Sequence, residues 1–235
     1  MNSVCIDGNN FSIIAYTSCG KVSEDKLEEA VYNSLARMLG NLKNKFSGDF
    51  YVCWDTRGGT TFRKRLDNNY KATRKPGAID FSIIEKTKSL YEDYGVKSIN
   101  IPRCEGDDAL YVLCKYLREE NPQSKIFVIS RDRDLLQIVQ AGYANQLWDP
   151  VKKESVAIPE YDVVKFKAIA GDSSDNIRGV AGIGPQGALK IFNGTKQLTE
   201  SQKIEYENCL KLVDARLNPN FENNYNMIRE ILKSS

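Results

Sequence analysis

The run "SVCID" (residues 3–7), near the start of the chain, decides which fold to expect. Its centre, Val4 to Ile6, is continuously apolar, a pattern typical of a strand that is buried on both faces of a parallel sheet. Three later runs have the same character: "DFYVCWD" (49–55), "SINIP" (98–102) and "KIFVIS" (125–130). Together the four runs predict four strands of one mostly parallel central sheet.

Helical patterns lie between these strands. The segments 23–46 and 106–120 repeat apolar residues at helical spacing, so strands and helices alternate along the chain. This alternation favours an α/β fold with helices on both faces of the sheet. After about residue 160 the strand patterns stop and the sequence becomes helical. We therefore expect an α/β core over residues 1–160 and a helical subdomain over residues 161–235.

Composition excludes several classes of function. The chain contains no histidine, and its six cysteines show no CxxC spacing, which argues against a zinc site and against a histidine base. Cys5 and Cys53 lie in apolar runs, as expected for buried thiols in a reducing cytosol. No apolar run approaches the ~20 residues of a membrane span, and the start does not resemble a secretion signal. We expect a cytoplasmic protein that does not contact membranes.

Acidic residues stand at or just after the ends of all four predicted strands. In open parallel sheets, ligands bind outside the carboxyl ends of the strands, so these side chains are predicted to gather at one edge. The acids concerned are Asp7, Asp55, Glu105, Asp107, Asp108, Asp132 and Asp134.

Each of these acids also has an ordinary structural explanation. Asp107 and Asp108 would stabilise a helix N-terminus, Asp132 and Asp134 would serve as turn and cap residues, and Asp7 precedes a glycine as turn residues do. Independent caps need not all meet at one end of a sheet, however. Their common position therefore favours a binding site over a set of unrelated caps.

Electrostatics indicates what such a site would hold. Two carboxylates 4 Å apart repel by roughly 1 kcal/mol in water and roughly 4 kcal/mol at an effective dielectric constant of 20. A cluster of seven must therefore be partly protonated or bind cations. Ligands that are all oxygen favour Mg²⁺ or Mn²⁺ over zinc or copper.

Basic residues surround these acids in the sequence. Nine of the 31 acids belong to the acidic motifs, and the other 22 stand against 33 Lys and Arg, an excess of eleven positive charges. The segment "RGGTTFRKRLDNNYKATRK" (57–75) alone has seven basic residues and one acid. It is either a solvated basic helix or a surface for a polyanion, and the separate acidic motifs favour a polyanion on a basic body with metal at the acids.

The stretch "AGDSSDNIRGVAGIGPQGA" (170–188) combines acidic residues, which favour a cation, with a glycine turn that favours an anion. It contains the remaining two motif acids, Asp172 and Asp175, and then a run of glycines with a proline at a predicted helix start. Glycines before a helix usually only shape a loop. Here they follow two site acids closely, and their backbone amides at a helix N-terminus are suited to a phosphate.

Taken together, the motifs resemble those of the flap endonuclease and 5′→3′ exonuclease family, which includes the 5′-nuclease domain of bacterial DNA polymerase I and stand-alone phage 5′ nucleases. The resemblance covers residues 1 to about 195. It implies a PIN-like 5′-nuclease fold with a basic helical arch at about 57–97 and a helix–three-turn–helix motif at about 163–193. The motifs, in order, are "IDGNN" (6–10), "CWDTRGGTTFRKRLDNNYKATR" (53–74), "EGDDAL" (105–110), "SRDRDLLQIV" (130–139) and "GDSSDNIRGVAGIGPQGALKI" (171–191).

The resemblance also implies roles for individual residues. Two divalent ions, Mg²⁺ or Mn²⁺, would bind at two groups of acids, with K⁺ at the helix–three-turn–helix motif. The first group is Asp7, Asp55, Glu105 and Asp107, and the second is Asp108, Asp132, Asp134 and Asp175, with Asp172 acting near it through water. Lys71 and Arg74 would contact the scissile phosphate. The DNA contacts would be Arg63, Tyr70, Gly182, Ile183, Gly184, Gln186, Gly187 and Lys190, with Tyr70 equally well explained as a core residue.

The resemblance therefore implies that the protein is a structure-selective 5′ nuclease, an exonuclease or flap endonuclease, that acts as a monomer in DNA replication and repair. Its substrates would be DNA with 5′ ends, flaps or nicks, and RNA–DNA hybrids, in a bacterial or phage-infected cell. One alternative is an RNase H-like 5′ nuclease acting mainly on RNA primers, and another is a non-cleaving protein that binds branched DNA. A PIN-type ribonuclease toxin would share the sheet and the acids but not "GVAGIGPQGA" (179–188). The presence of all nine acids favours an active nuclease.

Overall fold

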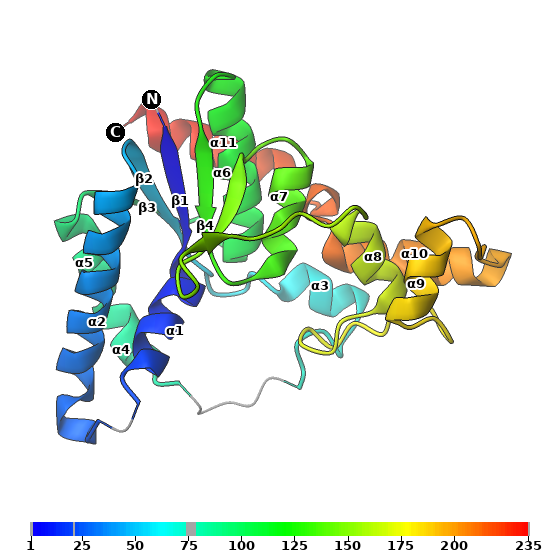
Figure 1. Cartoon of the computed structure of the whole chain (residues 1–235), viewed down its shortest axis with the longest axis horizontal. Coiled ribbons are helices and arrows are strands. Elements are labelled where there is room, and N and C mark those ends of the chain that lie inside the picture. The colour runs from blue at the N-terminus through cyan, green and yellow to red at the C-terminus, as the bar shows by residue number, and fades with distance from the viewer. Residues whose placement is uncertain (1, 21, 74–78, 235) are drawn as a thin grey trace.

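The computed structural model describes residues 2–20, 22–73 and 79–234. At its centre is a six-stranded sheet in the order β3-β2-β1-β4-β5-β6, in which β1 to β5 are parallel and β6 is antiparallel (Figure 1). The strands are β1 (Ser3–Asp7), β2 (Asp49–Cys53), β3 (Val96–Ile99), β4 (Ile126–Ile129), β5 (Gln146–Asp149) and β6 (Glu154–Ser155). The predicted mostly parallel sheet is confirmed, although the third strand begins earlier than expected and β5 and β6 were not predicted.

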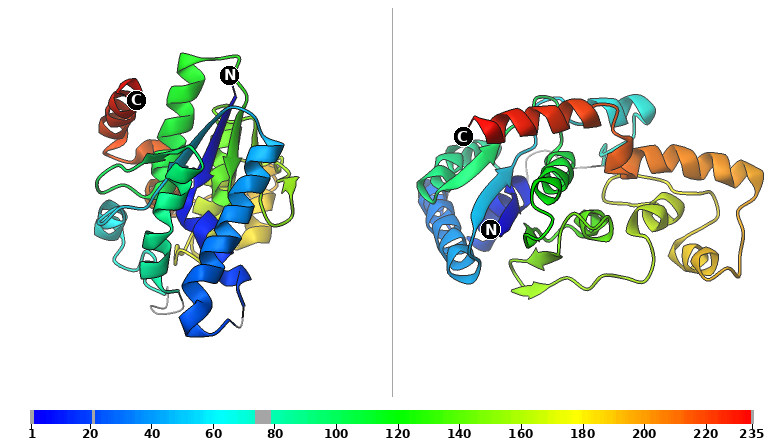
Figure 2. Two further views of the ribbon diagram at one scale, coloured as in Figure 1. Left: turned by 90° about the vertical axis from the view of Figure 1, so that its left-hand side faces the viewer. Right: turned by 90° about the horizontal axis from the view of Figure 1, so that it is seen from above.

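Alternate residues of the parallel strands point into two separate hydrophobic layers. In β1, Val4 and Ile6 belong to one layer, whereas Cys5 belongs to the other. The first layer is formed with α1 (Gly8–Ser18), α2 (Glu24–Lys45), α4 (Phe81–Lys86) and α5 (Lys88–Asp93). The second is formed with α6 (Gly106–Glu120), α7 (Leu136–Gln140) and α11 (Phe221–Lys233), so helices cover both faces (Figure 2).

A second group of helices lies beyond one edge of the sheet, on the right in Figure 1. It contains α3 (Thr61–Leu66), α8 (Val163–Ala170), α9 (Pro185–Phe192) and α10 (Glu200–Val213). Two small apolar clusters hold it together. One joins Tyr70, Val164, Ile177, Leu212 and Val213, and the other joins Ile169, Val180, Ile183 and Ala188.

The chain does not end within this second group. After α10, the short helix η2 (Ala215–Leu217) turns the chain, and α11 packs along α6 through Phe221, Tyr225 and Ile228. The C-terminal helix therefore belongs by its packing to the α/β core. The segment 213–218 links the core to the outlying helices.

Two further observations bear on the expectations from composition. All six cysteines are free thiols, and Cys5 and Cys53 are buried as predicted. Among the residues that the structure describes, no helix combines the length and the apolar character needed to cross a bilayer.

Candidate metal centre and nucleic-acid interface

The site begins at the point where the strand order of the sheet reverses, between β1 and β4. Asp7, the last residue of β1, caps α1 by accepting from the Asn10 amide at 3.0 Å, and its other oxygen accepts from Ser130 Oγ at 2.9 Å. Because Ser130 directly follows β4, this bond ties the two strand ends together. Ligands of doubly wound sheets bind at such switch points.

Asp55 joins the end of β2 to the start of α6. Its Oδ1 accepts from the Gly106 amide at 2.6 Å, and its Oδ2 accepts from Asn9 Nδ2 at 2.8 Å. Gly106 is the first residue of α6, so Asp107 follows in the first turn of that helix. The predicted acids of β1, β2 and α6 are therefore positioned by backbone amides and neighbouring side chains at one edge.

The acids at this edge destabilise one another's charged forms. Burial raises the pKa of Asp7 to about 7, with Asp132 and Asp55 adding to the effect. Burial also raises the pKa of Asp107 well above its usual value, and Asp132 and Asp7 raise it further. A bound cation would reverse these effects by favouring the ionised carboxylates.

Glu105 is buried and carries its charge because two cations face it. Lys71 Nζ and Arg63 Nη1 both donate to its carboxylate, and the Tyr70 hydroxyl donates at 3.3 Å. Burial alone would raise the pKa of Glu105, but Lys71 and then Arg63 outweigh it and lower the pKa below its usual value. Lys71 thus lies next to the first predicted acid group.

Asp108 is paired with Arg63, which it shares with Glu105. It is 2% exposed, and its two oxygens accept from Arg63 at 2.7 and 2.8 Å and from Asn218 Nδ2 at 2.9 Å. Arg63 Nε in turn donates to the Leu212 carbonyl at 2.8 Å. These bonds connect α6, α3 and the end of α10, so Asp108 serves here as a structural acid.

The same contacts involve two residues that were predicted to contact DNA. Arg63 is 5% exposed and Tyr70 is 3% exposed, so neither side chain is available to DNA in this structure. Arg63 is held by buried carboxylates, and Tyr70 packs with Val164, Ile177 and Leu212. Of the two explanations for Tyr70, the packing supports the core residue.

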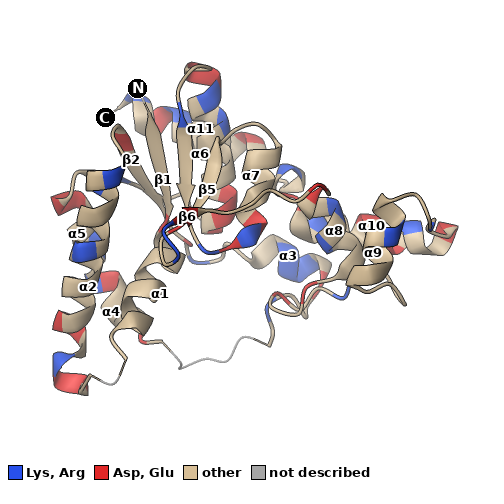
Figure 3. Ribbon diagram, in the orientation of Figure 1, with Lys and Arg blue, Asp and Glu red and all other residues tan. Residues whose placement is uncertain are grey.

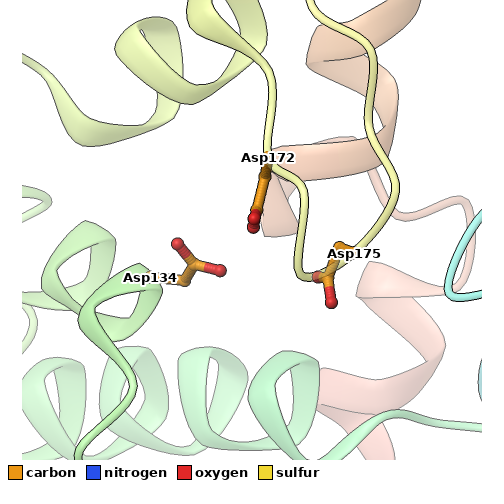
Figure 4. A group of neighbouring side chains, drawn as sticks. All are labelled: Asp134, Asp172 and Asp175. Atoms are coloured by element: carbon orange, nitrogen blue, oxygen red, sulfur yellow. The ribbon is translucent and has the colours of Figure 1, made fainter. Parts of the chain in front are cut away.

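The second predicted group is assembled from two distant parts of the chain. One carboxylate oxygen from each of Asp134, Asp172 and Asp175 lies within 4.8 Å of the others (Figure 4). Asp134 belongs to the short helix η1 (Arg133–Leu135), which Asp132 caps by accepting the Asp134 amide at 2.9 Å. Burial raises the pKa of Asp134 to about 6.

A lysine lies among these three acids. Lys167 Nζ contacts Asp134, lies 2.5 Å from Asp172 Oδ2 and lies 3.7 Å from Asp175 Oδ2. Burial of the Asp172 carboxyl would raise its pKa, but the bonds from Lys167 and Ser174 lower it below its usual value. Lys167 was not among the site residues predicted from the sequence. Its position five residues before Asp172 was the available signal, but the contact with Asp134 was not visible from spacing.

The loop carrying Asp172 and Asp175 also contacts the basic segment. Asp172 and Ile177 form an antiparallel bridge that closes the loop. The Lys71 amide donates to the Asp175 carbonyl at 2.9 Å, and Asn176 Nδ2 donates to the Asn69 carbonyl at 2.8 Å. The second acid group and Lys71 are therefore held in a fixed relation by backbone contacts.

The glycine turn, residues 182–187, lies at the start of α9. Gly182 has φ +71°, which favours glycine, whereas Gly184 has an extended backbone at the N-cap of α9, and a Cβ there would meet open space. Gln186 and Lys190 are exposed. The Ile183 side chain is 4% exposed and packs in the helical cluster, and its amide donates to Val180, so the predicted DNA contact of this residue is not supported.

Basic residues flank the acids on the side of the outlying helices. α3 carries Arg63, Lys64 and Arg65, and α8 carries Lys165 and Lys167 (Figure 3). Arg74, predicted to contact phosphate together with Lys71, lies outside the described residues.

Fold and site together define a class: a doubly wound α/β protein whose switch-point edge presents carboxylates suited to divalent cations. The chain belongs to the family described as 5′-3′ exonuclease, N-terminal resolvase-like domain, whose family model matches residues 2–168.

Several known proteins are similar to this chain. It is 29% identical over 202 residues to a 5′-3′ exonuclease of Mycoplasmopsis pulmonis, an alignment covering 82% of this chain and 66% of that protein. It is 28% identical over 215 residues to DNA polymerase I of Bacillus subtilis, covering 84% of this chain and 24% of the polymerase. The chain thus spans less than two thirds of the length of these relatives.

Solved structures share the fold. A crystal structure of the bacteriophage T5 D15 protein, co-crystallised with metal ions, superposes with a TM-score of 0.73 at 20% identity, covering 98% of this chain and 99% of the other. The T5 D15 flap endonuclease in a complex with DNA and metal ions gives a TM-score of 0.70 at 20% identity, covering 99% and 100%. The predicted fold class is therefore confirmed.

Proposed function

We propose that this protein is a structure-selective 5′ nuclease that hydrolyses DNA phosphodiesters with the help of divalent metal. The observation that carries the proposal is the meeting of acids from three strand ends and from the loop 172–177 at one edge. Related proteins support this proposal, because they include 5′-3′ exonucleases and a flap endonuclease of Shewanella denitrificans.

The donor set fits Mg²⁺ or Mn²⁺, because every candidate ligand is a carboxylate. Two groups would hold two ions, and the ions would supply positive charge to the scissile phosphate and lower the pKa of the attacking water. The first group is Asp7, Asp55, Glu105 and Asp107, and the second is Asp132, Asp134, Asp172 and Asp175. We leave Asp108 out of the second group because its oxygens accept from Arg63 and Asn218, which connect helices, whereas Glu105 also accepts from Lys71 at the site and stays in the first group.

Lys71 would act on the phosphate between the two groups. Its ammonium donates to Glu105 of the first group, and its amide donates to the Asp175 carbonyl of the second. Charge at this point would stabilise the negative charge that develops on the phosphate oxygens. Arg74 would add a second positive charge at the same phosphate, as the family resemblance implies.

The glycine turn would hold the duplex part of the substrate. The amides at the N-terminus of α9 carry partial positive charge, and the absence of a side chain at Gly184 leaves space for a close backbone approach. Lys190 would add a charge on the same helix, and K⁺ would bind at the turn. The loop 172–177, closed by the bridge between Asp172 and Ile177, would then connect this contact to the acids.

The expected substrates are DNA with 5′ ends, flaps or nicks, and RNA-primed duplexes, bound by a monomer. Mapping the products from 5′-labelled flap, nicked and RNA-primed duplexes tests this. We expect cleavage in Mg²⁺ and none in EDTA, strongly reduced in Asp134→Asn but not in Glu160→Gln, which changes an exposed acid. Binding without cleavage would instead support a non-cleaving branched-DNA-binding protein, and cleavage confined to RNA primers would support the RNase H-like alternative.

A further inference from the structure

Lys167 is a charged residue in the candidate site to which the proposed function gives no role. Its ammonium contacts Asp134 and lies 2.5 Å from Asp172 and 3.7 Å from Asp175, and its side chain is 11% exposed. Among the residues that the structure describes, these three acids form a group whose oxygens lie close enough together to share a metal ion. A single ammonium therefore stands among carboxylates that a divalent cation would otherwise neutralise.

The local fold holds Lys167 in this position. It lies in the last turn of α8, and its carbonyl accepts from the Gly171 amide at 2.9 Å. Gly171 has φ +80° and ends the helix, so the chain turns at once into the bridge between Asp172 and Ile177. The lysine and two of its three acids thus lie close together in the chain, next to a turn closed by a backbone bridge, and the third acid comes from η1.

The structure also provides a place for the ammonium to move. A cavity of about 520 Å³ adjoins the site, lined by Lys167 and by the site acids Asp132, Asp134 and Asp172, with Tyr161 and Phe166 among its apolar residues. A lysine has a flexible four-carbon stem and a compact charge, so its ammonium can leave the acids without a change in the helix.

We propose that Lys167 is a built-in counter-ion of the second acid group, which holds Asp134, Asp172 and Asp175 together without metal and competes with divalent metal for them. This inference rests on the proposed function, because it takes these acids to bind metal. An ammonium cannot coordinate a metal ion, and it repels one, so binding requires its displacement. Lys167 then sets the concentration of metal at which the second group fills.

Lys167→Met tests the competition, because methionine keeps much of the side-chain length and removes the charge. We expect a lower melting temperature than the parent in EDTA. The midpoint of a Ca²⁺ titration, followed by calorimetry or by the melting temperature, should fall about tenfold. Lys167→Arg should stay close to the parent. Lys165→Met removes an exposed charge from the same helix and should change neither quantity.

A second measurement uses the parent protein and does not depend on how the variants fold. Amine labelling followed by mass spectrometry should modify Lys167 slowly in EDTA and faster in saturating Ca²⁺ at matched ionic strength, whereas Lys165 should react equally in both. A labelling rate for Lys167 that metal does not change would overturn the inference, as would a Lys167→Met protein with the parent's Ca²⁺ midpoint. A parent that binds no divalent metal would overturn the proposed function together with the inference.

Discussion

The acidic edge, formed by the two acid groups of the proposed site, and the glycine turn at residues 182–187 are held by the fold in different ways. The acids are tied into the structure: Asp7 accepts from Asn10 and Ser130, and Asp55 accepts from Gly106 and Asn9. At Gly184, by contrast, an added Cβ would meet open space. Changes at the acidic edge should therefore affect stability and chemistry together, whereas changes at Gly184 should affect mainly substrate binding.

The largest expected effect comes from breaking the buried pairs that support the acidic edge. Arg63→Met leaves Asp108 buried without its charged partner and removes one of the two cations on Glu105. We expect the free energy of unfolding to fall by about 3–5 kcal/mol, measured by urea denaturation with an unchanged m-value. Lys64→Met, at an exposed position on the same helix, should stay within about 0.5 kcal/mol of the parent. Equal stability of Arg63→Met and the parent would contradict the structural role of this pair.

The next effect separates chemistry from binding. Asp175→Asn keeps the backbone carbonyl that accepts from Lys71 but removes one negative charge from the second acid group. We expect the single-turnover cleavage rate in Mg²⁺ to fall about a hundredfold or more, with duplex affinity in Ca²⁺ retained or increased. If cleavage continues at the parent's rate, Asp175 does not belong to the site.

A smaller effect is expected on the stability of the fold as the pH changes, because the pKa of Asp7 is raised to about 7 and that of Asp134 to about 6. Both lie above the 3.8 of an unperturbed Asp, so the stability these groups contribute is complete below pH 3.8 and is lost as the pH rises through the folded values. In EDTA, stability should therefore fall between about pH 4 and pH 7, by at most about 1.4 kcal/mol per pH unit for each group.

Divalent metal should remove this pH dependence, because it favours the ionised carboxylates. The lowered pKa of Glu105 acts in the opposite direction and costs stability only in more acidic solution, below its usual 4.5. The test is to record melting temperatures across this pH range in EDTA and in Mg²⁺ and to compare the two pH profiles. Parallel curves in the two conditions would argue against a metal site at the buried acids.

The smallest effect is expected at the glycine turn. Gly184→Val places a branched side chain in open space on an extended backbone, so stability should change by about 1 kcal/mol or less, mainly through a poorer N-cap. Affinity for branched duplex in Ca²⁺ should fall about tenfold, and less in Gly184→Ala, while stabilisation by metal is unchanged. A folded Gly184→Val protein that binds duplex as tightly as the parent would show that this turn is not the phosphate contact.

The positions of the acids could be predicted from the sequence because they depend on local patterns. Each apolar run indicates where a buried strand ends, and Asp7 and Asp55 lie at or just beyond those ends. Parallel strands bring their carboxyl ends to one edge whatever the rest of the chain does. The short strands β5 and β6 escaped prediction because "QLWD" (146–149) and a two-residue pair carry too little pattern to recognise.

What the sequence by itself determined is therefore the sheet, the helices on both its faces and the edge at which the acids meet, since these depend on residues close in the chain. Only the tertiary structure decided which partner each charged side chain contacts. Arg63 was expected at DNA and is instead buried against Asp108 and the Leu212 carbonyl, 149 residues away. Lys167 gained its place only because η1 and the loop 172–177 meet around it. A charged side chain faces solvent or a buried partner according to what packs against it, and residues distant in the sequence decide that packing.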